Sequence, residues 1–323
     1  MTKTLRLFDP EKDSTATQTV QTVIKAYLAH KRSENAAGIY SADSLDRATR
    51  YLNSFAADFG EQVIADCRAS DPQKWVLSHP EWKSPHTRLD AIGSVVTCFR
   101  WAADEPLIDR SPYRRRQTTW ECPSPRPAMK PAEYRKIMSL ARQCDGKGRR
   151  ARPSRHAFRR CLWFLWESGA RTCEGREVGW QHVDLDVGVA CLQKHKSKKA
   201  TGEDRVIPLR RVVVRYLTWL WESRKRPASG VIFLNGRGRP WTKGTFSKMF
   251  RKYARLAGVR EEVTAYCCRH GFTCRALEAG IGERQIADAL GHSTTRYVSW
   301  YGKSLRGKVD YLRSVVEKLD AKK

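Results

Sequence analysis

Three separated blocks in the C-terminal half of the sequence carry side chains that can bind a phosphate. Arg171 follows a glycine helix stop in SGARTCEGREV, Arg269 lies near the start of a helix in YCCRHGFTCRALEAG, and His292 follows a glycine in ALGHS. A guanidinium group can hold two phosphate oxygens at once, and the free N–H groups of a helix start favour the same ligand. If the chain folds these blocks together, they form an anion site.

Tyr297 and Tyr301 follow His292 by five and nine residues and are the candidate nucleophiles. Attack on a phosphodiester without a metal needs a nucleophile, cationic donors on the non-bridging oxygens and an acid for the leaving oxygen. The sequence has no clustered carboxylates that suggest paired Mg²⁺ ions and no GxxxxGK[ST] motif for ATP. The competing interpretation is structural, with Gly291 as a helix C-cap and both tyrosines as packing residues.

Charge predicts the partner. The 323 residues include 61 Lys plus Arg against 34 Asp plus Glu, a formal net charge of +27. Such an excess indicates a polyanion, with nucleic acid first and a membrane surface second. We see no apolar run long enough to span a bilayer and no signal-peptide core in MTKTLRLFDPEKD, so we expect a cytoplasmic, nucleoid-associated protein. The ten cysteines form no CxxC pair, which favours isolated thiols over zinc or disulfide frameworks.

The positions of apolar residues predict two domains. Residues 15 to 60 have the spacing of two amphipathic helices, further helices follow to about 110, and no strand pattern appears before 120. The stretch RSPYRRRQTTWECPSPRPAMKPAEY is rich in proline and arginine, as in a linker that can contact phosphate. Beyond it, helical patterns surround one predicted antiparallel hairpin, VDLDVGVACLQKH and RVIPL, joined by a polar turn.

The three blocks, taken in order, resemble the tyrosine recombinases, the phage integrases and their Cre- and Xer-like relatives. SGARTCE is similar to the family's T-G-x-R-x-x-E, and YCCRHGFTCRALEAGIGERQIADALGHS to H-x-x-R-H through L-G-H-S. The resemblance covers roughly residues 125 to 310. It implies a mainly α fold: a helical, SAM-like core-binding domain over 15–115, a basic linker over 116–130, and a catalytic domain over 131–323 with a small antiparallel sheet and a C-terminal tail helix.

The resemblance also implies roles. Arg171 and Arg269 would be the two catalytic arginines, His292 would hydrogen-bond the same phosphate, and Tyr301 would be the nucleophile, leaving Tyr297 to packing. The family's lysine, on the hairpin loop, would protonate the leaving oxygen. Lys196 is our first choice for it and Lys198 the second, ahead of Lys194 and Lys199. Glu174 matches the family's acidic position and would support the arginines.

One position departs from the pattern. The H-x-x-R motif usually begins with His or Lys, and here it begins with Tyr266. A tyrosine hydroxyl can donate to a phosphate oxygen but carries no positive charge. We therefore expect phosphate binding at this position to persist and its acid–base role to be altered.

The function implied is site-specific DNA recombination through a 3′-phosphotyrosyl intermediate, without metal, ATP or another cofactor. The implied partners are double-stranded DNA with inverted-repeat sites, a homo-tetramer on two duplexes, and accessory DNA-bending factors. A type IB topoisomerase-like relaxing enzyme and a decayed DNA-binding module are the alternatives. Basic residues of the linker and of a glycine-rich turn before a basic helix are candidate DNA contacts: Arg114, Arg115, Arg116, Arg237, Arg239, Lys243 and Lys248.

Overall fold

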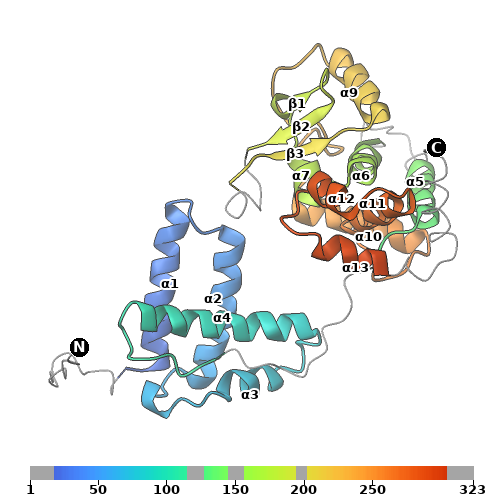
Figure 1. Ribbon diagram of the computed structural model, residues 1–323. Coiled ribbons are helices and arrows are strands. Elements are labelled where there is room, and N and C mark those ends of the chain that lie inside the picture. The colour runs from blue at the N-terminus through green and yellow to red at the C-terminus, as the bar shows by residue number, and fades with distance from the viewer. Residues whose placement is uncertain (1–17, 115–126, 145–155, 194–201, 304–323) are drawn as a thin grey trace, which may run out of the picture. The chain divides into compact units, whose positions relative to one another are not determined.

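The structure, a computed structural model, describes residues 18–114, 127–144, 156–193 and 202–303 (Figure 1). The chain divides into two compact units, residues 1–123 and 124–323, and each is described by itself. No helix in the described ranges is both long and apolar enough to cross a membrane.

The N-terminal unit is helical throughout its described residues. Its helices are α1 (Val20–Ala36), α2 (Ala42–Phe59), the short 3₁₀ turn η2 (Ile64–Asp66), α3 (Asp71–Leu77) and α4 (Pro85–Asp104). The hydroxyl groups of Thr19 and Ser41 cap the first two helices by accepting from backbone N–H groups of the first turn. One apolar face of each long helix forms a shared core that includes Ile24, Leu52 and Phe99. The helical pattern predicted for this region is confirmed.

The C-terminal unit surrounds a small sheet with helices. Its elements are α5 (Pro131–Cys144), α6 (Ala157–Ser168), α7 (Thr172–Glu177), the 3₁₀ turn η4 (Trp180–His182), β1 (Val183–Asp184), β2 (Val189–Leu192), β3 (Arg205–Pro208), α9 (Arg211–Ser223), α10 (Lys243–Leu256), α11 (Cys267–Glu278), α12 (Glu283–Leu290) and α13 (Arg296–Lys303). In Figure 1 the strands lie at one edge of the helices, with α9 beside them. The predicted fold class, mainly α with a small antiparallel sheet, is confirmed.

The sheet differs from the predicted hairpin in one respect. Its described strands run antiparallel in the order β1-β2-β3, and Ala190 pairs with both Val183 and Ile207. The first predicted strand is therefore two strands. The Asp184 carboxylate accepts from the backbone N–H groups of Asp186 and Val187 and closes a tight turn, which Gly188 completes at a φ of 74°.

Helix α6 is the centre of the C-terminal core. Phe164, Leu165 and Cys161 of this helix are fully buried, and the apolar faces of α5, α10 and α11 pack around it. A second, smaller cluster joins α11, α12 and α13 through residues such as Leu277, Leu290 and Val298. The ends of α6, α11 and α12 therefore meet at fixed positions, and the candidate site is built on those ends. All described cysteines are free thiols.

Candidate active site

The C-terminal end of α6 places the first arginine. Gly169 caps this helix at a φ of 63°, and a Cβ there would come within 2.7–2.9 Å of Phe272 and Leu290. A glycine is needed both for the left-handed backbone and for this close approach to α11 and α12. The chain then turns into α7 at Arg171, so the Arg171 side chain starts next to the ends of two other helices.

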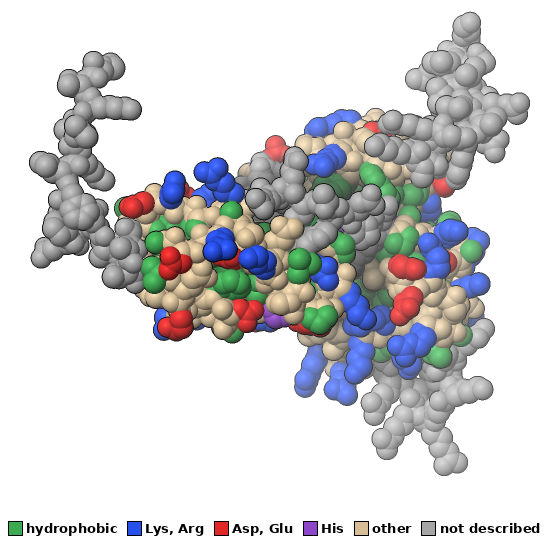
Figure 2. Space-filling model, turned by 90° about the horizontal axis from the view of Figure 1, so that it is seen from below, with side chains coloured by type: hydrophobic (Ala, Val, Ile, Leu, Met, Phe, Trp, Pro, Cys, Tyr) green, Lys and Arg blue, Asp and Glu red, His purple; other side chains and the backbone are tan. Residues whose placement is uncertain are grey.

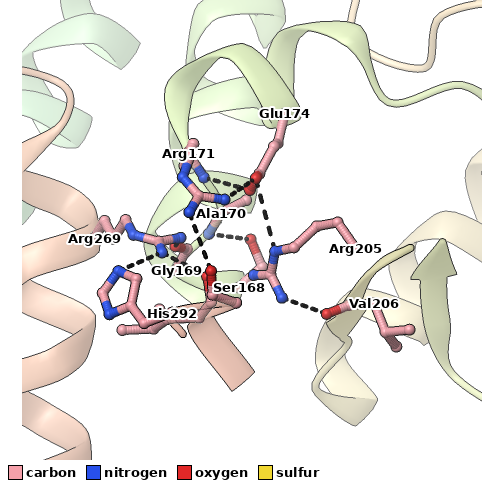
Figure 3. A network of polar contacts seen from close by, with 11 residues as sticks. Ser168, Gly169, Ala170, Arg171, Glu174, Arg205, Val206, Arg269 and His292 are labelled. Carbon is pink, nitrogen blue, oxygen red and sulfur yellow. Dashed lines mark hydrogen bonds and ion pairs between the residues drawn. The ribbon is translucent and has the colours of Figure 1, made fainter. Parts of the chain in front are cut away.

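Arg269 is the buried centre of the site (Figure 3). It lies in the first turn of α11, has 2% relative exposure, and donates from Nη1 to the Gly169 carbonyl (3.0 Å) and from Nη2 to the Leu290 carbonyl (2.5 Å). Both acceptors are carbonyls at helix C-terminal ends, where a cation is favoured. Burial, with Arg171 nearby, lowers the pKa of Arg269 to about 10, so it stays charged at neutral pH.

Glu174 holds Arg171 in place. Its carboxylate accepts from the Arg171 backbone N–H (2.8 Å) and from Arg171 Nη1 (2.6 Å), while Arg171 Nη2 donates to the Gly291 carbonyl at 3.2 Å. The Glu174 side chain has only 3% exposure. Burial raises its pKa, but the neighbouring Arg205 and Arg171 outweigh this and hold the pKa below its usual value, so it is a carboxylate.

His292 completes the cluster from the end of α12. Gly291 caps that helix at a φ of 66°, as the C-cap interpretation expected, and turns the next residue toward Arg269. Arg269 Nη2 lies 2.8 Å from His292 Nε2. Burial and the surrounding arginines lower the pKa of His292 to about 4, so the ring is neutral near pH 7. Because an arginine can only donate, Nε2 is the acceptor and Nδ1 carries the proton. Nδ1 has no partner among the described residues.

The candidate tyrosines occupy different environments. Tyr301, on α13, has 6% exposure, and its ring centre lies 5.0 Å from that of His270. Burial raises the pKa of the Tyr301 phenol above its usual value. The ring centre of Tyr266 also lies 5.0 Å from that of His270. Tyr297 is 62% exposed, and its ring is 5.7 Å from that of His292. The packing role expected for Tyr297 is therefore wrong, because its position on α13 faces away from the cluster that buries Val298 and Tyr301.

Four of the predicted residues therefore lie together in the structure: Arg171, Glu174, Arg269 and His292. The rings of Tyr266 and Tyr301 both lie near His270, the residue that follows Arg269 in the sequence. Several predicted residues lie outside the described ranges. They are the candidate acids Lys194, Lys196, Lys198 and Lys199, the linker residues Arg115 and Arg116, and the expected tail helix. Arg114, Arg237, Arg239, Lys243 and Lys248 are all exposed.

Arg205 belongs to the site although the sequence analysis did not select it. It is the first residue of β3, is 3% exposed, and its Nε lies 3.7 Å from Glu174 Oε1. The strand alternates buried and exposed positions, so Arg205 and Ile207 face inward together. The alternation is visible only in the burial of the folded strand, since the residue types Arg, Val, Ile and Pro do not show which face is buried, so the sequence offered no local signal for Arg205.

Comparison with known proteins agrees with this geometry. The model of the Phage integrase family matches residues 127–307. The tyrosine recombinase XerD of Staphylococcus haemolyticus is 31% identical over 140 residues, which cover 42% of this chain and 46% of that protein. XerD of Staphylococcus aureus is 29% identical over 154 residues, covering 45% and 50%. The chain thus matches about half the length of these relatives.

Solved structures share the fold over most of the chain. A Tn1549 transposon integrase bound to a circular intermediate DNA has a TM-score of 0.70 at 18% identity, covering 93% of this chain and 99% of that one. A lambda integrase dimer bound to a COC′ core site has a TM-score of 0.69 at 16% identity, covering 94% and 83%. Since the family model spans more than half of the sequence, this chain belongs to the phage integrase family of tyrosine recombinases.

Proposed function

We propose that this protein is a site-specific DNA recombinase that cuts and rejoins DNA through a 3′-phosphotyrosyl intermediate. The observation that carries the proposal is that Arg171, Arg269 and His292 lie together: Arg269 contacts His292, and Arg171 is held by Glu174 and by the Gly291 carbonyl next to His292. Three arginines, Arg171, Arg205 and Arg269, lie near the single carboxylate of Glu174 in a largely buried site. The excess positive charge favours an anionic ligand such as a phosphate. Membership of the family supports the same conclusion.

The reaction follows from the groups present. Arg171 and Arg269 would bind the non-bridging oxygens of the scissile phosphate and stabilise the charge of the transition state. The N–H at Nδ1 of His292 would donate to the same phosphate. The Tyr301 oxygen would attack phosphorus and give its proton to water as the O–P bond forms. The bond from phosphorus to the 5′-oxygen would break, and that oxygen would take a proton from an acid and leave as the 5′-hydroxyl. The phosphodiester energy is kept in the phosphotyrosine, so rejoining needs no ATP.

The general acid in this proposal is a lysine of the loop between β2 and β3, with Lys196 first and Lys198 second. A lysine ammonium can give up a proton to the 5′-oxygen, which a permanently charged guanidinium cannot do near neutral pH. Tyr266 takes the place of the family's usual His or Lys and would serve as a neutral hydrogen-bond donor to the phosphate.

The burial of Tyr301 adds a step to the proposal. With 6% exposure and a raised pKa, its phenol is protected from solvent on α13 in the DNA-free chain. Attack therefore requires α13 to present Tyr301 to the phosphate once DNA is bound. This helix packs on α11 and α12 through the small cluster that includes Val298 and Tyr301, and the Ser299 hydroxyl donates to the Glu283 carboxylate of α12. The rearrangement would break these contacts and leave the main core around α6 in place.

The partner in this proposal is duplex DNA with inverted-repeat sites. Figure 2 shows Lys and Arg side chains gathered more densely than Asp and Glu on the face that it presents. Similar proteins have been solved on DNA, including a lambda integrase tetramer bound to a Holliday junction. By analogy we propose a homo-tetramer on two duplexes, working in the cytoplasm where the nucleoid lies. Accessory DNA-bending factors are part of the same analogy. The helical unit of residues 15–115 would be the second DNA-binding domain.

The deciding experiment is formation of a covalent adduct without metal or nucleotide. The DNA flanking the gene is first sequenced to find short inverted repeats. Purified protein is then mixed in EDTA with a nicked suicide substrate that carries them. We expect a protein–DNA adduct that resists denaturation and is released by a phosphotyrosine diesterase. A reaction that stops in EDTA and returns with Mg²⁺ would contradict the proposed chemistry. Relaxation of supercoiled DNA that contains no such repeats, at the same rate, would favour a topoisomerase-like enzyme.

A further inference from the structure

Arg205 is a buried cation with incomplete hydrogen bonding. Its side chain has 2% exposure, and Nη1 donates to the carbonyl of the adjacent Val206. Nε faces Glu174 Oε1 at 3.7 Å, beyond hydrogen-bond distance, and Nη2 has no partner among the described residues. A guanidinium held in this way in the interior is costly unless it interacts with other charges. The cost suggests that Arg205 serves the site it borders.

The same side chain supports the backbone beside His292. A Cβ on Gly291 would come within 2.7 Å of Arg205 Cδ and 2.9 Å of Arg205 Nε. The stem of Arg205 therefore packs directly on the peptide that accepts from Arg171 Nη2 and leads into His292. Figure 3 shows Arg205 reaching from the strand toward Glu174 on one side of this cluster, with Arg269 and His292 on the other.

We propose that Arg205 is a positioning residue, which shares the Glu174 carboxylate with Arg171 and backs the Gly291–His292 peptide. With Arg205 present, Glu174 is balanced by two cations, so its hold on Arg171 is weakened enough for Arg171 to bind the phosphate. Without it, Arg171 is the remaining ion-pair partner of Glu174 among the described residues, and the peptide before His292 loses its packing on the Arg205 stem. This inference rests on the proposed recombinase function.

The test compares Arg205→Met, which removes the charge at similar size, with Arg205→Lys, which retains it. We expect Arg205→Met to lower the single-turnover rate of adduct formation by about 10- to 100-fold, since small displacements of catalytic groups have effects of that order. DNA affinity should change little, because Arg205 is buried. Arg205→Lys should recover most of the rate. The matched control is Arg210→Met, which removes an exposed arginine paired with Glu167 from the same segment and should leave the rate unchanged.

A second readout does not depend on DNA. In ¹³C- or ¹⁵N-labelled protein, NMR titration gives the pKa of His292, whose charged and titratable neighbours are Arg269, Arg171, Arg205 and His270. Arg205→Met should raise that pKa toward its usual value, and Arg205→Lys should leave it near that of the parent protein. If Arg205→Met does not fold, Arg205→Gln, which removes the charge but keeps a polar side chain, takes its place and should show the same fall in rate and the same rise in the pKa of His292.

Two results would overturn the proposal. The first is an Arg205→Met variant that forms the adduct at the rate of the parent protein and has an unchanged His292 pKa. A rate that falls only in step with DNA affinity, in both Arg205 variants, would also overturn it, because it would make Arg205 a DNA contact. If the parent protein forms no adduct at all, the proposed function fails, but the titration still decides whether Arg205 positions His292.

Discussion

Arg269 Nη2 and His292 Nε2 lie 2.8 Å apart, and this pair joins the start of α11 to the end of α12. The guanidinium can only donate, so the imidazole must accept and must therefore be neutral. A protonated His292 would face the Arg269 cation with no lone pair to offer. Burial, followed by the nearby Arg269, lowers the pKa of His292 to about 4, and the neutral ring keeps its proton on Nδ1.

Protonation of His292 should reduce the stability of the fold. The pKa is about 4 in the folded protein and 6.5 in the unfolded chain, so the unfolded chain binds more protons between those values. The free energy of unfolding should therefore fall as the pH is lowered from 6.5 toward 4. Urea unfolding at a series of pH values between 6.5 and 4 measures this free energy.

His292→Gln is the control for that titration. It retains a side chain that can accept from Arg269 but does not titrate, so the slope above pH 4.5 should become flatter. Below that pH, protonation of Glu174, whose folded pKa is held below 4.5, should destabilise both proteins. An unchanged slope in His292→Gln would assign the pH dependence to other groups.

Tyr301→Phe should abolish the covalent adduct and retain binding to the site. The change removes one oxygen from a buried ring and should cost about 1 kcal/mol of stability or less. Adduct formation is read on a denaturing gel with the nicked suicide substrate, and binding by gel shift.

Tyr297→Phe is the informative partner variant, because Tyr297 is exposed and its ring is the one near His292. We expect it to form the adduct at nearly the parental rate. If Tyr301→Phe forms the adduct and Tyr297→Phe does not, the assignment of the nucleophile is reversed.

Arg269→Lys should be destabilising as well as inactive. A single ammonium cannot reach the Gly169 carbonyl, the Leu290 carbonyl and His292 in the directions that the planar guanidinium does. Leaving one buried carbonyl unsatisfied costs about 1–3 kcal/mol. Chemical denaturation gives the loss, and Arg284→Lys is the control, because Arg284 forms an exposed pair with Asp288. Equal losses in both variants would show that the buried network contributes nothing special.

Binding to DNA should weaken steeply with salt. Each phosphate neutralised contributes about −0.9 to the slope of log K against log salt. Lys243→Ala and Lys248→Ala should each make the slope shallower by about that amount if these exposed residues of α10 contact phosphates. Arg226→Ala is the control, since its guanidinium already pairs with Glu222 and stacks on Trp221. Slopes that do not differ would remove α10 from the proposed DNA surface.

The sequence alone determined the helical architecture and the identity of the cluster. Apolar residues at helical spacing in α1, α2 and α6 report which faces are buried, and glycines after α6 and α12 mark left-handed ends. Arg171, Arg269 and His292 could be selected because their motifs lie in a fixed order. The sheet was only partly predictable, since the turn closed by Asp184 interrupts a stretch whose composition is that of one strand.

Only the tertiary structure decided how the site is held together. Arg205 lies far along the chain from Glu174 and Gly291, and nothing local in RVIPL says that its guanidinium faces them. The environment of Tyr297 was wrongly predicted: both tyrosines are on α13, but its packing buries Tyr301 beside His270 and leaves Tyr297 exposed near His292. The physical reason is the same in each case. The local sequence pattern predicts which residues are buried and where helices end. Which charged side chains pair and which rings come into contact depends on which helix ends meet in the folded chain.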